Sequence, residues 1–186
     1  DKIGLIVFAG NAYTQMPITT DGVSAKMFLN EISTNMVTSQ GTAIGSAIKL
    51  AMNSFTKNEK TQKAIIIITD GENHEDDAVA MAKEAKEKGI QVNVVGMGTV
   101  RGSQIPLENG QLMKDNDGNV VTTRLNETMA KDIAIAGGGL YVSGNSTDAV
   151  KILDEQLQKL AKTELETTVY SAHNEQFPVF SWLALI

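Results

Sequence analysis

The chain contains no cysteine and only two histidines among its 186 residues. Without cysteine there is no disulfide scaffold, no Cys-ligated zinc and no thiol nucleophile. The two histidines, His74 and His173, form no His-Glu-x-x-His pattern, and the sequence offers no partners that would complete a nucleophilic triad with either of them. These absences exclude thiol enzymes and argue against zinc hydrolases and serine-type hydrolases.

The sequence also lacks a cluster of basic residues and a complete dinucleotide-binding or calcium-binding motif. The sequence has 16 Lys and Arg against 22 Asp and Glu, a formal net charge of −6, and no long basic run. Nucleic-acid surfaces need clustered Lys and Arg, so a nucleic-acid partner is not predicted. The Gly96-Met97-Gly98 segment lacks the third glycine and the following helix of a dinucleotide fingerprint. In Asp115–Gly118 the EF-hand pattern fails, because Met113 stands where an oxygen ligand is required.

Both ends of the sequence carry apolar segments. The chain opens inside a strand-like run, Ile3–Ala9, with no initiator Met or signal peptide before it. It closes on the apolar run 177–186, about half of the roughly 20 apolar residues that a spanning helix needs. We interpret both ends as cuts through a longer protein. The run 177–186 would be the start of a transmembrane segment, with Phe180 and Trp182 near the membrane interface.

Strand-like and helix-like patterns alternate along the rest of the chain. Nearly unbroken apolar runs predict strands buried on both faces, and a run that contains a proline suits an edge strand. Apolar residues at helical spacing predict the helices. The expected strands are 3–9, 13–19 (edge), 63–71, 91–95 and 140–142, and the expected helices begin at Asp21, Ile44, Glu75, Asn126 and Ser146 or Thr147. This order predicts an α/β fold with a doubly wound, mostly parallel sheet and helices on both faces.

Several helix faces and one insertion can be assigned in more detail. The first helix is predicted to bury Ala25, Phe28, Leu29 and Ile32, and the last to bury Val150, Leu153, Leu157 and Leu160. Residues 103–123 break the alternation. This segment contains Asn109-Gly110 and Asp117-Gly118, two strong hairpin signals. It is therefore predicted to be a small β-meander inserted after a core strand.

Two polar residues lie at the ends of predicted elements, where they could contribute to a binding site. Ligands of such sheets bind at the carboxyl ends of the strands. Asp70 ends the central strand, and Thr42 begins a helix one β-α unit earlier. An Asp carboxylate and a Thr hydroxyl suit a hard cation such as Mg²⁺. From the residues alone, Asp70 capping a turn or Thr42 capping its helix remains an equal or simpler interpretation. The rim of this candidate site comprises Gly41, Gly71, Glu72 and Asn73.

Together these motifs resemble the von Willebrand factor A family, over residues 1–162. That family has a metal-ion-dependent adhesion site built from three loops, with Asp-x-Ser-x-Ser in the first, a Thr in the second and a Thr-Asp-Gly turn in the third. Thr42 and Asp70 match the second and third loops, and Gly137–Tyr141 resembles the last helix-to-strand turn. Asp-x-Ser-x-Ser is absent between Asp1 and Gly41. The first β-α unit, with its central strand, is therefore interpreted as missing.

Within the family, the sequence is most similar to bacterial membrane-anchored aerotolerance (Bat-type) proteins. The similar segments are Lys2–Gly10, Gln15–Asp21 and Asp70–His74. The resemblance implies a domain over 1–162, a linker over 163–176 and a membrane anchor that starts at 177–186. It also implies location at the bacterial inner membrane with the domain in the periplasm.

The resemblance implies a binding module rather than an enzyme. In the complete protein a Mg²⁺ or Mn²⁺ ion would be held by Thr42, Asp70 and the missing loop, with one position open to a carboxylate of a partner protein. Sister von Willebrand factor A proteins and a MoxR-type ATPase are the implied partners. The alternative is a Mg²⁺-dependent hydrolase or phosphatase of the doubly wound class that uses Asp70.

The missing strand has its own structural consequence. The family places it between the strands Ile3–Ala9 and Ala64–Thr69. We predict that these strands either close on each other or leave a gap, with the segment 177–186 lying elsewhere. Unpaired strand edges invite pairing with other chains, so this stretch of sequence on its own is expected to aggregate.

Overall fold

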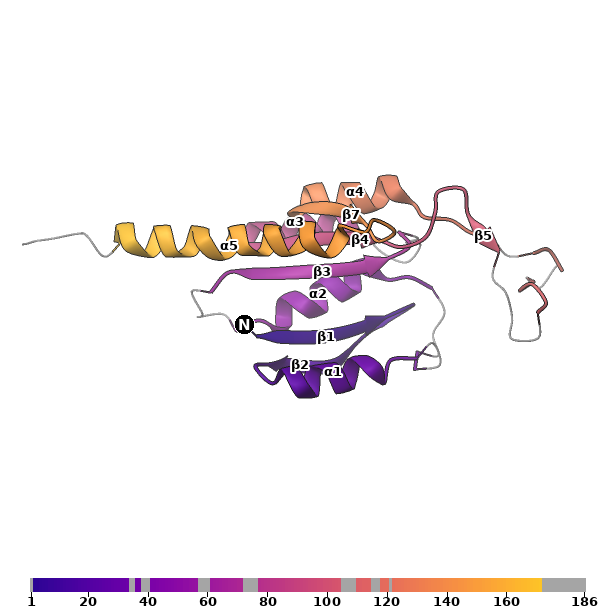
Figure 1. Ribbon diagram of the computed structural model, residues 1–186, viewed down its shortest axis with the longest axis horizontal. Helices are drawn as coiled ribbons and strands as arrows, with labels where there is room; N and C mark the ends of the chain where they lie inside the picture. Colours follow the sequence, from indigo (N-terminus) through magenta and orange to yellow (C-terminus); the bar gives the residue numbers. More distant parts are fainter. Residues whose placement is uncertain are drawn as a thin grey trace, which may run out of the picture.

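The structure is a computed structural model, and it describes residues 2–33, 36–37, 41–56, 61–71, 77–104, 110–114, 118–120 and 122–171 (Figure 1). The elements follow in the order β1 (Ile3–Phe8), β2 (Ala12–Thr19), α1 (Gly22–Asn30), α2 (Ile44–Ser54), β3 (Lys63–Thr69), α3 (Ala78–Glu87), β4 (Ile90–Gly96), β5 (Ser103–Gln104), β6 (Thr122–Thr123), α4 (Glu127–Ala136), β7 (Gly138–Ser143) and α5 (Ala149–Ser171). This is the predicted doubly wound α/β fold.

The central sheet is parallel, with the strand order β3-β4-β7. Ile65 pairs with Val92 and Ile67 with Val94, so these four side chains share one face. That face packs against α2, α3 and α4 to form the core. On the other face, where α5 contacts β7, Ile66 and Ile68 are 41% and 63% exposed. Burial of one face of β3 therefore drives the fold, and the other face is only partly covered.

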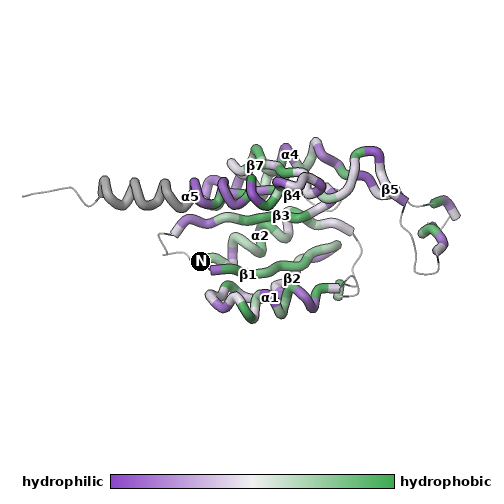
Figure 2. The backbone as a smooth tube through the Cα atoms, viewed as in Figure 1, coloured by the Kyte–Doolittle hydropathy of each residue, from purple (hydrophilic) through white to green (hydrophobic). Residues whose placement is uncertain are grey.

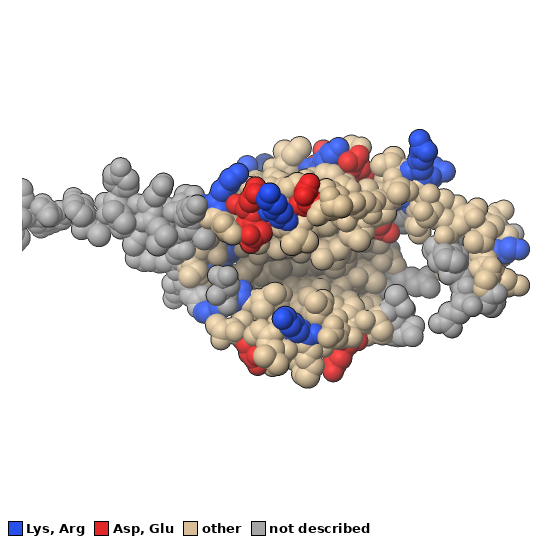
Figure 3. Space-filling model, viewed as in Figure 1, with Lys and Arg blue, Asp and Glu red and all other residues tan. Residues whose placement is uncertain are grey.

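β1 and β2 form a separate antiparallel pair. Among the described residues β1 has no strand partner on its other side, and β3 pairs only with β4. Figure 3 shows a hollow between these two parts of the molecule. α2 bridges them, because it contacts β1 and β2 while its Ile44 and Ile48 belong to the core cluster. Of the two predicted outcomes for these strands, the open gap is the one observed.

The distribution of hydrophobic residues follows this arrangement. Figure 2 shows β1 and β3 as predominantly hydrophobic segments that face each other across the gap.

Helix α1 contacts β1 and β2 but has no buried residue. Of its predicted buried face, Ala25 and Phe28 are half-buried, whereas Leu29 and Ile32 are 57% and 37% exposed. The predictions for Leu29 and Ile32 are wrong, because a two-stranded ribbon is too narrow to cover the whole face of a helix.

The pairing of β4 with β7 contains an irregularity that the sequence did not reveal. Its register shifts between Val92 and Val94. Asn93 lies at the shift with no exposed surface, and its Oδ1 accepts the backbone N–H of Leu140 at 3.1 Å. A buried amide is tolerated because it satisfies a strand group that the shift would otherwise leave unpaired.

The insertion forms short antiparallel pieces. β5 pairs with β6, and Lys114 forms an isolated antiparallel bridge with Val120. The bridge closes around Gly118, whose φ of +85° suits the predicted hairpin turn. Gly110 also has a positive φ, but Asn109 and Asp117 lie outside the described residues. The insertion projects from the end of the molecule at which β3 and β4 terminate (Figure 1).

Helix boundaries depart from the expectations in two places. α3 begins at Ala78 with Asp77 as its N-cap, and Glu75 and Asp76 lie outside the described residues. α5 continues to Ser171, so the first part of the predicted linker 163–176 is helical. Leu153, Leu157 and Leu160 are half-buried as predicted, but the prediction for Val150 is wrong, because this side chain is 82% exposed.

The predicted membrane segment, 177–186, lies outside the described residues. Within the part of the chain that is described, no helix has both the length and the apolar character needed to cross a membrane.

Candidate functional site

Thr42 lies where the chain passes from the end of β1 to the start of α2. The N–H of the next residue, Ala43, donates to the carbonyl of Ala9 at 2.8 Å, which fixes this turn beside the carboxyl end of β1. α2 begins at Ile44, with Ala43 at its N-cap. Thr42 is half-buried and does not cap the helix. The capping interpretation of Thr42 is therefore wrong.

Asp70 directly follows β3, in a turn that is held by its neighbours. The Thr69 Oγ1 accepts the N–H of Gly71 at 3.1 Å, and the Thr69 carbonyl accepts the N–H of Met97 at 2.8 Å. The N-terminus of α3 is capped by Asp77, whose Oδ1 accepts the N–H of Ala80 at 2.9 Å. Asp70 is thus positioned by the end of the sheet and does not cap α3.

A distant loop fixes the backbone of this turn. The N–H of Asn126 donates to the carbonyl of Asp70 at 2.9 Å, and the N–H of Leu125 donates to the carbonyl of Thr99 at 3.1 Å. Gly71 is buried with a φ of +77°, and a Cβ built on it would lie 2.5 Å from the Asn126 carbonyl oxygen. Only glycine fits both the backbone conformation and the close approach.

Sequence reasoning assigned Asn126 only as the cap of α4, a role it has: its Oδ1 accepts the N–H of Met129 at 3.2 Å. Its backbone contact with Asp70 carries no sequence signal, because a main-chain donor looks the same at every non-proline position.

The candidate residues share one edge of the fold. Figure 1 draws β1 and β3 pointing the same way, so the turns that carry Thr42 and Asp70 lie at the same end of the molecule. Gly41 is exposed and Gly71 is buried at this edge. The other two rim residues, Glu72 and Asn73, lie outside the described residues.

The chemistry of these donors suits a hard cation. A Thr hydroxyl and an Asp carboxylate are oxygen ligands of the kind that Mg²⁺ and Mn²⁺ take. Among the described residues, no group of three or more His, Cys, Asp or Glu side chains could hold a metal ion. The two residues therefore fit part of a site, and the remaining ligands would be water or residues outside the described segments.

Comparison with known proteins agrees with the family resemblance of the sequence. A family model described as "von Willebrand factor type A domain" matches residues 1–179. A crystal structure described as conserved hypothetical protein BatB from Bacteroides thetaiotaomicron is 52% identical, with a TM-score of 0.84 over 87% of this chain and 80% of that chain. An aerotolerance-related membrane protein from Bacteroides fragilis NCTC 9343 is also 52% identical, with a TM-score of 0.81 over 86% and 80%.

More distant matches show the fold alone. Proximal thread matrix protein 1 from the mussel byssus, described with a zinc-occupied MIDAS motif, is 16% identical with a TM-score of 0.58, over 83% of this chain and 33% of that chain. The chain spans 54% and 37% of the length of the two uncharacterized curated relatives that it matches, from Borreliella burgdorferi and Bacillus subtilis.

Proposed function

Because this chain belongs to the von Willebrand factor type A domain family, we propose that it is a metal-ion-dependent module that binds another protein. The observation that carries the proposal is the placement of Thr42 and Asp70 in two turns at one edge of the fold, each fixed by backbone hydrogen bonds. Family members of this kind are interaction modules, and the described residues of this surface present oxygen ligands without a nucleophile and base of a known hydrolase pattern.

The cation we propose is Mg²⁺ or Mn²⁺. Thr42 and Asp70 would supply two of its ligands, and an Asp-x-Ser-x-Ser loop that precedes residue 1 in the natural protein would supply others. The zinc-occupied motif of the mussel protein supports a divalent cation at such sites in this fold. When bound, the ion would offer an open coordination position to a partner carboxylate. The residues of this chain would orient it and keep few negative charges around it.

We further propose that the protein is anchored in the bacterial inner membrane, with this domain in the periplasm and residues 177–186 starting the anchor. The similarity to a protein described as an aerotolerance-related membrane protein supports this location. Sister von Willebrand factor A proteins and a MoxR-type ATPase are the partners we propose from the same resemblance.

The proposal predicts that the natural full-length protein is stabilised by Mg²⁺. A ligand that binds only the folded state at about 100 times its Kd adds about 2.7 kcal/mol to the free energy of unfolding. We expect millimolar Mg²⁺ to raise the melting temperature of the wild type, and EDTA to reverse the rise. Asp70→Asn and Thr42→Val should abolish or reduce it. Asp77→Asn, which alters a carboxylate that caps α3, is the matched control and should keep the response.

A melting temperature that Mg²⁺ and Mn²⁺ leave unchanged in the full-length wild type would contradict the metal site. An equal response in Asp70→Asn would contradict the assignment of Asp70.

A hydrolase that uses Asp70 is the alternative function. It would need a second acidic group and a cation beside the transferred phosphoryl group. We expect no turnover of p-nitrophenyl phosphate with Mg²⁺ above that of Asp70→Asn. Turnover that disappears in Asp70→Asn would replace the binding module by an enzyme.

A further inference from the structure

The insertion is attached to the domain through a hydrogen-bonded neck, which we define as Thr99–Gly102 and Thr122–Asn126. The Thr99 carbonyl accepts two backbone N–H groups, those of Gly102 and Leu125, each at 3.1 Å. The β5-β6 pair continues directly from this neck. The Thr99 carbonyl therefore connects the segment that leads into the insertion with the segment that leads out of it.

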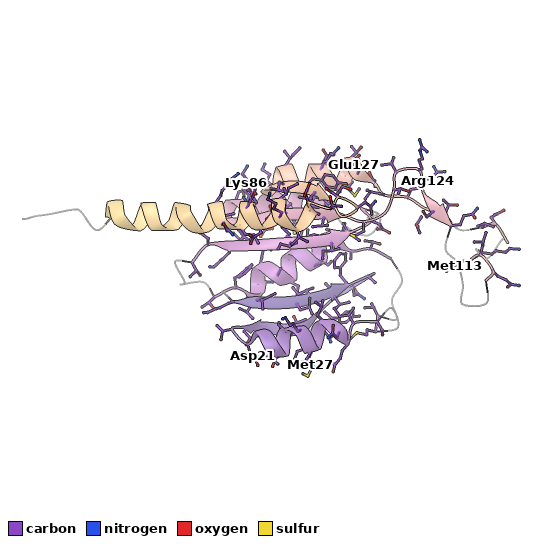
Figure 4. All side chains as sticks on the ribbon, viewed as in Figure 1. Asp21, Met27, Lys86, Met113, Arg124 and Glu127 are labelled. Atoms are coloured by element: carbon purple, nitrogen blue, oxygen red, sulfur yellow. The ribbon has the colours of Figure 1, made fainter. Side chains whose placement is uncertain are left out.

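The same neck is joined to the candidate metal edge. The N–H of Asn126 donates to the carbonyl of Asp70 at 2.9 Å. Arg124 lies two residues before Asn126 in the chain, a separation of at most about 7 Å between their Cα atoms. The neck thus places the base of the Arg124 side chain close to the Asp70 turn, and Figure 4 shows Arg124 nearer the domain than Met113 of the insertion.

The backbone of the neck also sets the course of the Arg124 side chain. Gly102 has a φ of +85°, and a Cβ built on it would lie 2.8 Å from the Arg124 Cγ. The aliphatic stem of Arg124 therefore lies across Gly102, beside Arg101. Both arginine residues are exposed, so the neck presents two cationic side chains.

These charges have no counterpart among the described residues. No ion pair within that part of the chain involves Arg101 or Arg124. Between positions 97 and 126 the sequence contains three basic residues, Arg101, Lys114 and Arg124, and three acidic residues. The acidic residues of the insertion, Glu108, Asp115 and Asp117, lie outside the described residues. The Thr99–Gly102 turn also exposes Val100 by 60%.

We propose that Arg101 and Arg124 form a second contact point for the partner, which binds a further carboxylate of the segment whose first carboxylate reaches the metal edge. This inference rests on the proposed function. Guanidinium groups match carboxylates with two parallel hydrogen bonds, and exposed Val100 suits an apolar residue in the same segment. The partner is then an acidic segment with at least two carboxylates, and the neck selects it over proteins that offer a single acid.

The test uses the natural full-length protein with Mg²⁺ and a short fluorescein-labelled peptide in which Glu alternates with Ala. Its counterpart with Gln in place of Glu is the peptide control. Fluorescence anisotropy gives the Kd. Arg101→Gln combined with Arg124→Gln keeps much of the aliphatic stems and should raise the Kd about tenfold, because two exposed guanidinium–carboxylate pairs are lost. Replacing both arginines with Lys should restore part of the binding, since the charge remains.

The matched control variant is Lys83→Gln combined with Lys151→Gln, which removes the same charge from exposed positions on α3 and α5. Its Kd should stay within twofold of the wild type. An equal loss in this control would show that net charge alone governs binding and would overturn the inference, as would a wild type that does not bind the Glu peptide.

The inference and the proposed function fail in distinguishable ways. Binding that EDTA and Asp70→Asn weaken but the paired arginine variant leaves unchanged overturns the second contact point and leaves the metal module standing. Binding that needs the arginines but neither Mg²⁺ nor Asp70 overturns the metal module, and with it the joint recognition proposed here.

Discussion

Replacing Ile133 with Ala is expected to lower the free energy of unfolding by about 2–5 kcal/mol. Ile133 lies in α4 with no exposed surface, inside the cluster that joins α2, α3 and α4 to the parallel sheet. Removing its three outer carbons loses buried apolar contact and leaves a cavity that helices packed on a sheet cannot close. Thermal or urea unfolding of the natural protein measures the change, and the melting temperature should fall by roughly 10 °C.

Ile135→Ala provides the control on the same helix. Ile135 is 71% exposed, so its truncation should change the free energy of unfolding by less than about 0.5 kcal/mol. Equal effects of the two substitutions would mean that α4 does not present Ile133 to the core.

Gly71→Ala is expected to cost roughly 2–4 kcal/mol and also to weaken the response to Mg²⁺. The φ of +77° strains any residue with a Cβ, and the new Cβ would meet the Asn126 carbonyl oxygen at 2.5 Å. That carbonyl belongs to backbone and cannot rotate away alone. Relief of the clash therefore moves the loop whose N–H holds Asp70.

Gly89→Ala separates the two causes. Gly89 has a similar φ of +74°, but a Cβ built there meets no atom within 4 Å. It should show only the conformational cost, on the order of 1–2 kcal/mol, and keep the full Mg²⁺ response. A Gly71→Ala protein as stable and as responsive as Gly89→Ala would remove the close contact with Asn126 from the account.

The parts of the fold that follow from local patterns could be predicted from the sequence. Four consecutive isoleucines, Ile65–Ile68, predicted a strand, and the helical spacing from Ile44 predicted α2. The prediction that this strand is central and buried on both faces is wrong, because β3 pairs only with β4 among the described strands and Ile66 and Ile68 are exposed. Asp70 and Thr42 were predicted as site residues because strand ends and helix starts are recognisable in a sequence. Their position at the same end of the fold was expected from a parallel sheet, and in the structure β1 and β3 point the same way although they are not paired (Figure 1).

The parts that depend on contacts between distant segments could not be predicted. Asn93 reads as a polar interruption in a strand, and only the register shift of β4 against β7 explains it. The Asn126 N–H that holds Asp70 is a backbone group with no side-chain signature. Val150 fits the helical spacing of Leu153, yet the path of α5 along β7 leaves it exposed. Each of these three features depends on contacts between segments that are distant in the sequence.

The open gap between β1 and β3 connects the fold to the proposed function. Two strand edges face each other there, and Ile66 and Ile68 remain exposed beside them. A strand that enters this gap in parallel with β3 would end at the same edge as Thr42 and Asp70. We therefore propose that the segment which completes the sheet also brings the Asp-x-Ser-x-Ser loop to the metal. The expected aggregation of residues 1–186 alone remains a prediction.

A crystal of the natural full-length domain grown with Mn²⁺ tests the central claim most directly. Anomalous scattering locates Mn²⁺ without reference to the surrounding protein. We predict one strong peak at the edge formed by the ends of β1 and β3, within coordination distance, about 2.1–2.2 Å, of an Asp70 carboxylate oxygen. A fully ordered domain with no peak there, or with its strongest peak at residues other than Asp70 and Thr42, would contradict the account.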